Sequence, residues 1–178
     1  PNPNFYIYAN SDVNVLIDDQ RTGAMGANDV VIRLESTNQS IVNIDFNSTS
    51  DAVVLSSAFS SSMKLLSGSV INNSDTNYGT IRGLSGTFDE IHNVQITSTS
   101  GVEGVIFANS GQIPLISAVT INVSGNLYGI RQESGGGNLV TIQDVDIISS
   151  SSNIGGILLE AIVGAVLKDV SVLTTGPS

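Results

Sequence analysis

The segment HNVQITSTSGVEGVIFANSG, residues 92–111, contains two short apolar runs separated by polar residues and ends in glycine. A related pattern returns at residues 117–135 as SAVTINVSGNLYGIRQESG and at residues 143–164 as QDVDIISSSSNIGGILLEAIVG. Around Val94-Gln95-Ile96-Thr97, apolar residues alternate with polar ones, which is typical of a β-strand with one buried face. The chain therefore repeats a unit that contains at least two short strands.

The repeat has a nearly constant period. One large apolar position recurs at steps of 25 or 26 residues, at Phe46, Ile71, Ile96, Ile121, Ile147 and Val172. A glycine introduces the second strand of four units, at Gly79, Gly104, Gly129 and Gly156. A fixed period of this length indicates stacked repeats, in which each unit buries its apolar face against its neighbours, whereas an antiparallel sandwich does not require it. We predict an all-β parallel β-helix (β-solenoid) with about 25 residues per coil and about six to seven coils.

Three segments share a common motif. They are Asn93-Val94-Gln95-Ile96, Asp144-Val145-Asp146-Ile147 and Asp169-Val170-Ser171-Val172, and a glycine follows each of the first two. In these segments the chain resembles right-handed parallel β-helices of the pectin-lyase-like superfamily, including autotransporter-adhesin passenger regions and phage tailspikes. The resemblance covers about residues 41–178 and implies a right-handed coil. Such folds include lyases, hydrolases, adhesins and structural fibres, so the resemblance implies an architecture and no single activity.

The domain organisation follows from the same series. We expect one β-solenoid domain over residues 1–178, with regular coils over residues 41–178. Residues 1–40 fit the series poorly, and we interpret them as irregular first coils or as an N-terminal cap, because a solenoid needs covered ends. Since the last coil ends without a cap, we expect the domain to be a segment of a longer protein.

Composition excludes several classes of function. The net charge is −10 and the chain has only six Lys and Arg residues, which argues against nucleic-acid binding and against an acidic membrane surface. The absence of Cys excludes disulfides and thiol catalysis. The longest nearly apolar stretch, residues 154–167, is too short to span a bilayer. We expect a secreted or cell-surface location, because acidic, Cys-free chains of this composition are typical of secreted bacterial proteins.

Acidic residues supply the candidates for catalysis. Asp144 and Asp169 lie one repeat apart, Asp146 lies beside them, and Glu133 and Glu160 are nearly in register. Paired carboxylates can act as acid and base, but Asn and Asp also commonly form turns, and we favour the structural interpretation. His92 is the only histidine, and we assign it no catalytic role. We expect no cofactor.

The alternative to the expectation of no cofactor is a bound calcium ion. Carboxylate and amide oxygens at residues 10–14, at Asp18 and Asp19, and at residues 144–146 could each contribute part of a calcium site. None of these segments matches an EF-hand loop or a calcium-binding nonapeptide repeat. Hydrogen bonds within turns are the competing explanation.

Two surface features indicate partners. Tyr78 and Tyr128 each precede a glycine of the series, and Arg82 and Arg131 follow them, so these four residues could form a binding strip. The outward position after the large apolar residue is polar at Asn72, Thr97 and Asn122 but apolar at Ile148 and Leu173. Ile148 and Leu173 could form an interface with another subunit or an adjoining domain, or they could be two isolated surface residues.

These observations favour a structural and interaction module. We expect a rigid β-solenoid in an adhesin-like, fibre or tailspike protein, which displays flat faces to a glycan or protein ligand. The alternative is a polysaccharide lyase or glycoside hydrolase domain with stacked carboxylates. Three or more acidic or basic side chains that converge in one groove would favour the enzyme.

Overall fold

The fold is all-β, as predicted, in a computed structural model of the chain. The described residues form fifteen secondary-structure elements, all of them strands, and no helix occurs among these residues. None of these residues belongs to a helix that could cross a membrane. The structure describes residues 5–10, 16–19, 30–35, 40–48, 53–58, 62–72, 80–84, 87–98, 104–108, 112–124, 128–132, 140–150, 156–160 and 164–176.

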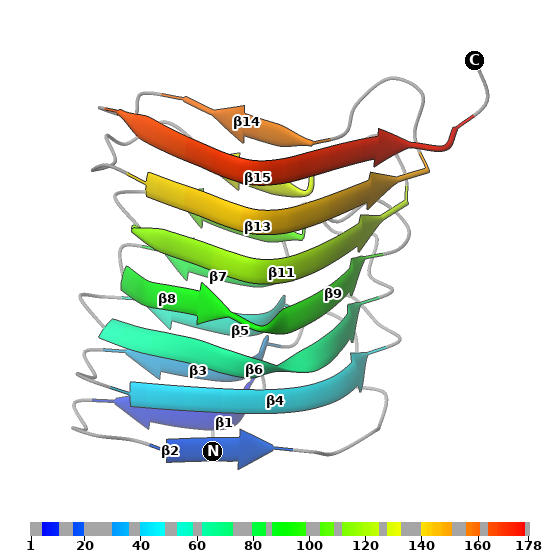
Figure 1. The fold of residues 1–178 in the computed structure, drawn as a ribbon. Coiled ribbons are helices and arrows are strands. Elements are labelled where there is room, and N and C mark those ends of the chain that lie inside the picture. Colours follow the sequence, from blue (N-terminus) through cyan, green and yellow to red (C-terminus); the bar gives the residue numbers. More distant parts are fainter. Residues whose placement is uncertain are drawn as a thin grey trace.

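The strands form two parallel sheets, and the chain passes from one sheet to the other after nearly every strand (Figure 1). The first sheet contains, in spatial order, β1 (Phe5–Asn10), β3 (Val30–Glu35), β5 (Val53–Ala58), β7 (Ile81–Leu84), β10 (Val105–Ala108), β12 (Ile130–Gln132) and β14 (Ile157–Leu159). The second contains β2 (Leu16–Asp19), β4 (Ser40–Ser48), β6 (Ser62–Asn72), β8 (Thr87–His92), β9 (Val94–Ser98), β11 (Leu115–Val123), β13 (Val140–Ser149) and β15 (Ala165–Thr174). β8 and β9 both lie between β6 and β11.

The pairing register places residues from successive repeats side by side. We call residues at the same register position on successive strands a row. Ile96 pairs with Ile121, Ile121 with Ile147, and Ile147 with Val172, as the sequence series predicts. Such neighbours are about 4.8 Å apart across a sheet. A repeat of 25 or 26 residues therefore corresponds to one step across the sheet.

One member of the predicted series is wrong. Val70, and not Ile71, pairs with both Phe46 and Ile96, while Ile71 pairs with Thr97 in the neighbouring outward row. The pairing of β6 is irregular at two places, opposite Val42 and Asn43 of β4 and at Met63 and Lys64. The second irregularity shifts the register between β6 and the following strands by one residue, so that Ile96 lies opposite Val70. A β-bulge inserts a residue into one strand and moves every later residue by one position, which reverses the faces.

The predicted glycine series also changes at one position. Gly79 lies outside the described residues, and Thr80 occupies the position before Ile81 that Gly104 occupies before Val105. Thr80 is fully buried, and its Oγ1 lies 2.5 Å from Oγ of Ser98. This hydrogen bond joins the start of β7 to the end of β9 and satisfies two hydroxyl groups that are shielded from water.

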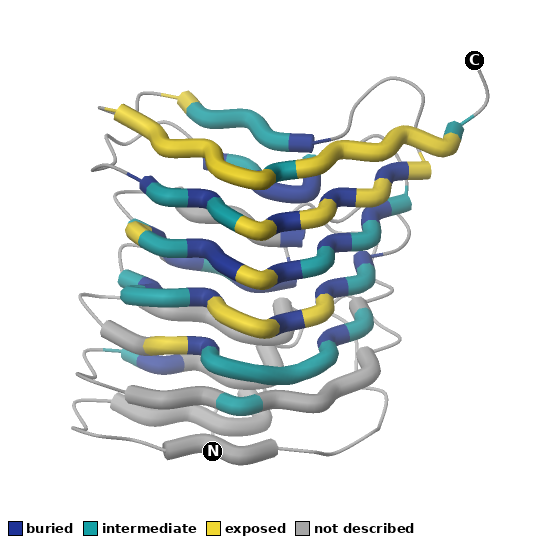
Figure 2. The backbone as a smooth tube through the Cα atoms, in the orientation of Figure 1, coloured by how far each residue is buried: buried dark blue, intermediate teal, exposed yellow. Residues whose placement is uncertain are grey.

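The core lies between the two sheets. Inward-facing aliphatic residues of β8, β11 and β13 are fully buried, and Ile81 and Ile130 face them from the first sheet. Burying one such side chain stabilises the fold by about 1.5–3 kcal/mol. Figure 2 shows buried residues along the described middle strands and an exposed β15 at one end.

From β8 to β15, each repeat of the second sheet bends at one residue with a left-handed backbone. Asn93, Ala118, Asp144 and Asp169 have φ values of 54°, 51°, 52° and 51°. The register places these four residues in one row, which we call the bend row. Because a left-handed residue interrupts the extended backbone, the alternation of faces restarts after it. Ile116 and Val119, three positions apart, are therefore both buried.

Residues 1–40 contain strands with the same pairing interval. Phe5 pairs with Val30, and Leu16 pairs with Ile41, each 25 residues further along the chain. The predicted division near residue 40 and the single domain remain predictions.

Replacing Gln132 by methionine is expected to raise the free energy of unfolding by about 1 kcal/mol. Gln132 is only 2% exposed, and its Oε1 atom is buried without a hydrogen-bond partner, so removing that oxygen removes a desolvation cost. Urea denaturation followed by circular dichroism measures the change. Gln143→Met, at a half-buried outward position of β13, is the matched control with little expected effect. A loss of stability in Gln132→Met would mean that Oε1 has a water partner.

Candidate binding groove

The outward face of the second sheet carries rows of polar side chains. One row contains Gln95, Thr120, Asp146 and Ser171, and the Ser171 hydroxyl donates a hydrogen bond to Oδ1 of Asp146. Another contains His92 and Ser117, whose Nδ1 and Oγ atoms are 2.9 Å apart. Contacts between adjacent strands thus hold these side chains at strand spacing.

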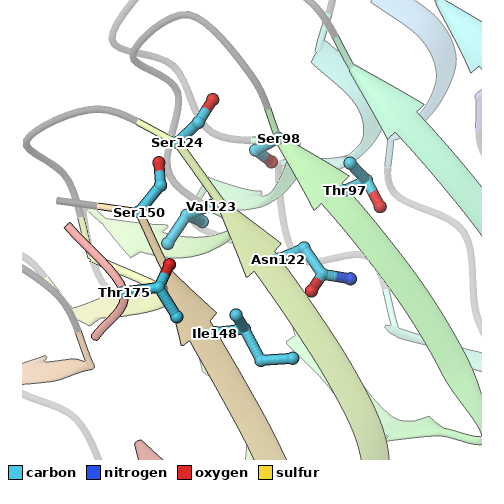
Figure 3. Close-up of a pocket in the computed structure, with 8 residues that line it drawn as sticks. All are labelled: Thr97, Ser98, Asn122, Val123, Ser124, Ile148, Ser150 and Thr175. Carbon is cyan, nitrogen blue, oxygen red and sulfur yellow. The ribbon is translucent and has the colours of Figure 1, made fainter. Parts of the chain in front are cut away.

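A groove of about 190 Å³ lies where β9, β11 and β13 end (Figure 3). On its floor, Asn122 pairs with Thr97 on one side and with Ile148 on the other. Three hydroxyl residues, Ser124, Ser150 and Thr175, lie just beyond the ends of β11, β13 and β15. Ser98 and Val123 complete the lining. We call this hollow the strand-end groove.

Backbone hydrogen bonds beyond the strand ends fix the hydroxyl residues. Ser124 N donates to Ser98 O at 2.9 Å, Ser150 N donates to Val123 O at 3.0 Å, and Thr175 N donates to Ser149 O at 2.7 Å. Because the same bond recurs at each step, the hydroxyl groups occupy equivalent positions one strand apart.

The lining is chemically neutral. It combines hydroxyl groups and one carboxamide with the aliphatic side chains of Val123 and Ile148, and it contains no ionisable side chain. Hydroxyl and amide groups both donate and accept hydrogen bonds. The accessible surface of the groove is mainly apolar, and the hydroxyl and amide groups contribute its smaller polar part. The groove can therefore bind a ligand that combines apolar surface with neutral polar groups.

The predicted acidic candidates are distributed over different sites. Asp144 and Asp169 are exposed members of the bend row, where short polar residues are favoured by their tolerance of a left-handed backbone. Asp146 is exposed and accepts the Ser171 hydrogen bond. Glu160 follows β14 in the other sheet and is exposed. Glu133 lies outside the described residues.

His92 and Ser117 are of the residue types that form the base and the nucleophile of a catalytic triad. A triad also needs an acid that orients the histidine. Among the hydrogen bonds described for His92, the partner is Ser117, and no carboxylate takes that third role. Ser117 is also only 4% exposed, so its hydroxyl is poorly accessible to a substrate.

The two arginines of the predicted Tyr and Arg strip lie on the first sheet. Arg82 and Arg131 each pair with Ile106, so they occupy one row with this residue between them. Tyr128 is half-buried before β12, and its carbonyl accepts a hydrogen bond from Gly104 N at 3.4 Å. Tyr78 lies outside the described residues. Arg82 and Arg131 therefore share the first sheet, and none of the three described members lines the strand-end groove.

The two predicted interface residues are neighbours. Ile148 pairs with Leu173, and both side chains are exposed on the outward face of β13 and β15. Of the two, Ile148 lines the groove. Regarding calcium, the described residues contain no cluster of three or more His, Asp or Glu side chains that could hold a metal ion.

The sequence analysis did not identify the hydroxyl side of the groove. A signal exists, because Ser124, Ser150 and Thr175 each follow a member of the inward series by three residues, after Ile121, Ile147 and Val172. Ser and Thr are abundant in the chain, which conceals this regularity. Comparisons of the chain with family models, with curated proteins and with solved structures find no match.

Proposed function

We propose that the chain forms a right-handed parallel β-solenoid of the pectin-lyase-like type, with about 25 residues per coil and about six to seven coils. The parallel rows from Ile96 to Val172 support this proposal, as does the passage of the chain from one sheet to the other. Stacked strands with a continuous apolar interior make a stiff unit, because each strand is held by its neighbours.

Its proposed role is that of a structural and interaction module in a secreted or cell-surface protein of the adhesin, fibre or tailspike kind. The observation that carries this role is the strand-end groove, which is built from equivalent positions on successive strands. A ligand that lies along the stack would meet a hydroxyl group at each step, from Ser124, Ser150 and Thr175. Such a site suits an extended ligand and needs no conformational change.

A neutral glycan chain is the proposed ligand class. The groove offers hydroxyl and amide groups together with the apolar surface of Ile148, and it has no charged group to select an ionic ligand. The net charge of −10 disfavours acidic polymers by long-range repulsion. A protein ligand is the other class that the experiment must distinguish.

A glycan array with the intact chain, with and without calcium, tests this function. We expect neutral glycans to bind, and we expect Asn122→Ala to weaken binding roughly five- to tenfold, because one hydrogen bond to a neutral group contributes about 1 kcal/mol. Isothermal titration with the best glycan measures the change.

Thr141→Ala is the matched control, since Thr141 faces outward at the other end of β13. It should bind as the unmodified chain does. Equal weakening by both variants would contradict the groove assignment, and an array without any neutral glycan signal would contradict the ligand class. Cleavage of a bound glycan would favour the lyase or hydrolase alternative.

A further inference from the structure

The middle of the strand-end groove is formed by strands that have a neighbour on each side. Thr97, Asn122 and Ile148 follow one another in an outward row on β9, β11 and β13. Thr97 and Asn122 are half-buried, and Ile148 is 37% exposed. Figure 3 shows Asn122 and Ile148 on adjacent strands of the groove. A ligand therefore meets a carboxamide and an aliphatic side chain one strand spacing apart, about 4.8 Å.

The apolar surface of the groove is aliphatic. None of the described residues that line it is aromatic. Val123 is only 3% exposed, so Ile148 is the more accessible of the two aliphatic side chains in the lining. Aromatic side chains supply the wide, flat apolar surface that covers the face of a sugar ring. Because Ile148 is narrower than an aromatic ring system, it suits a compact apolar substituent of a sugar better than the sugar ring itself.

An acetamido group combines the two chemistries that this part of the groove presents. Its methyl group is small and apolar, and its amide has one N–H donor and one carbonyl acceptor. The carboxamide of Asn122 offers both a donor and an acceptor, so it can pair with that amide. When the methyl group contacts Ile148, the amide lies within reach of Asn122 on the neighbouring strand.

Other sugar substituents match less of the lining. The methyl group of a 6-deoxy sugar can contact Ile148, but it brings no amide to pair with Asn122. A carboxylate would bring a charge to a lining that has no ionisable side chain to compensate it. The hydroxyl groups of the sugar ring itself find partners at Ser124 and Ser150, beyond the strand ends.

We infer that the strand-end groove is selective for glycans that carry acetamido groups, with Ile148 in contact with the methyl group and Asn122 in contact with the amide. The inference rests on the proposed function, which supplies the neutral glycan as the ligand class. Burial of a single methyl group raises affinity about fourfold, and a hydrogen bond to the amide adds to this preference. Ile148 is therefore the residue that determines specificity.

Pairs of glycans that differ only at carbon 2 test this inference with the intact chain. On the array, each acetamido glycan is compared with its hydroxyl counterpart, as tri-N-acetylchitotriose is with cellotriose. We expect the acetamido member to bind at least fourfold more tightly, as measured by isothermal titration with the best pair. Equal affinities within the pairs would overturn the inference and leave glycan binding in place. An array without any neutral glycan signal would overturn the proposed function as well.

Substitution of Ile148 gives a second test. Ile148→Ser should weaken binding of the acetamido glycan about fourfold and leave its hydroxyl counterpart nearly unchanged, so the ratio of the two affinities falls toward one. Leu173→Ser is the matched control, because Leu173 follows Ile148 in the same outward row, is 56% exposed and does not line the groove. Circular dichroism checks the fold, and Ile148→Thr keeps the β-branched shape if Ile148→Ser does not fold. An unchanged ratio in the Ile148 variant, or an equal fall in Leu173→Ser, would overturn the inference.

Discussion

Replacing Gly104 by alanine is expected to lower the free energy of unfolding by about 3 kcal/mol, as overpacking of a rigid core does. A Cβ atom at this position would lie 2.6 Å from Cγ2 of Ile121 and 2.7 Å from the carbonyl oxygen of Gly129. The entropic gain from replacing glycine is at most about 1 kcal/mol, so the steric term dominates. Urea denaturation followed by circular dichroism measures the difference.

Gly129 provides a control with a different outcome. The three nearest atoms to a Cβ atom at Gly129 all belong to Ile147, with Cγ2 at 2.7 Å and Cδ1 at 3.0 Å. Ile147→Ala removes both atoms, so Gly129→Ala combined with Ile147→Ala should lose less stability than the sum of the single changes. Ile121→Ala should rescue Gly104→Ala less well, because the Gly129 carbonyl remains in place. Equal coupling in the two cycles would contradict this explanation.

The same contacts explain which part of the fold could be predicted from the sequence. Glycine recurs at Gly104, Gly129 and Gly156 because the inward residue of the other sheet approaches the backbone there, as Val172 does within 3.3 Å of a Cβ atom built at Gly156. A contact that every repeat must make leaves a periodic signal in the sequence. The all-β class and the pairing of Ile96 with Ile121 followed from this signal.

Local irregularities could not be predicted in the same way. The bulge near Met63 and Lys64 moves Ile71 out of the inward row, and nothing in the spacing of apolar residues distinguishes Val70 from Ile71. Both residues are β-branched and aliphatic, so either could fill the position. Only the pairing with neighbouring strands decides between them.

The candidate site was predicted less completely than the fold. Of the groove residues, Ile148 was identified as a surface feature and Thr97 and Asn122 as members of its row, while Ser124, Ser150 and Thr175 were not. Surface positions of a repeat are not constrained by a shared core, so their residue types vary from one repeat to the next. A groove of this kind becomes evident only when the strands are placed side by side.

Replacing Asp144 by valine is expected to lower the free energy of unfolding by about 2 kcal/mol, because a β-branched residue is disfavoured in the left-handed region. Asp144 has a φ of 52° and an exposed side chain, so its backbone conformation dominates over its contacts. Asp146→Val, two residues further along the same strand, lacks this strain and should lose much less. Thermal and urea denaturation of both variants measure the contrast.

The bend row also separates a conformational role of Asp144 from a chemical one. Asparagine tolerates the left-handed backbone as well as aspartate does, so Asp144→Asn should keep both stability and glycan binding. Ala118 has no such tolerance, and Ala118→Asn should raise the free energy of unfolding by about 1 kcal/mol, since it relieves the same strain. Two results would contradict this explanation. If Asp144→Asn abolished glycan binding or a calcium response, the carboxylate itself would be the functional group. If Asp144→Val remained stable, the left-handed backbone would not explain why aspartate occupies this position.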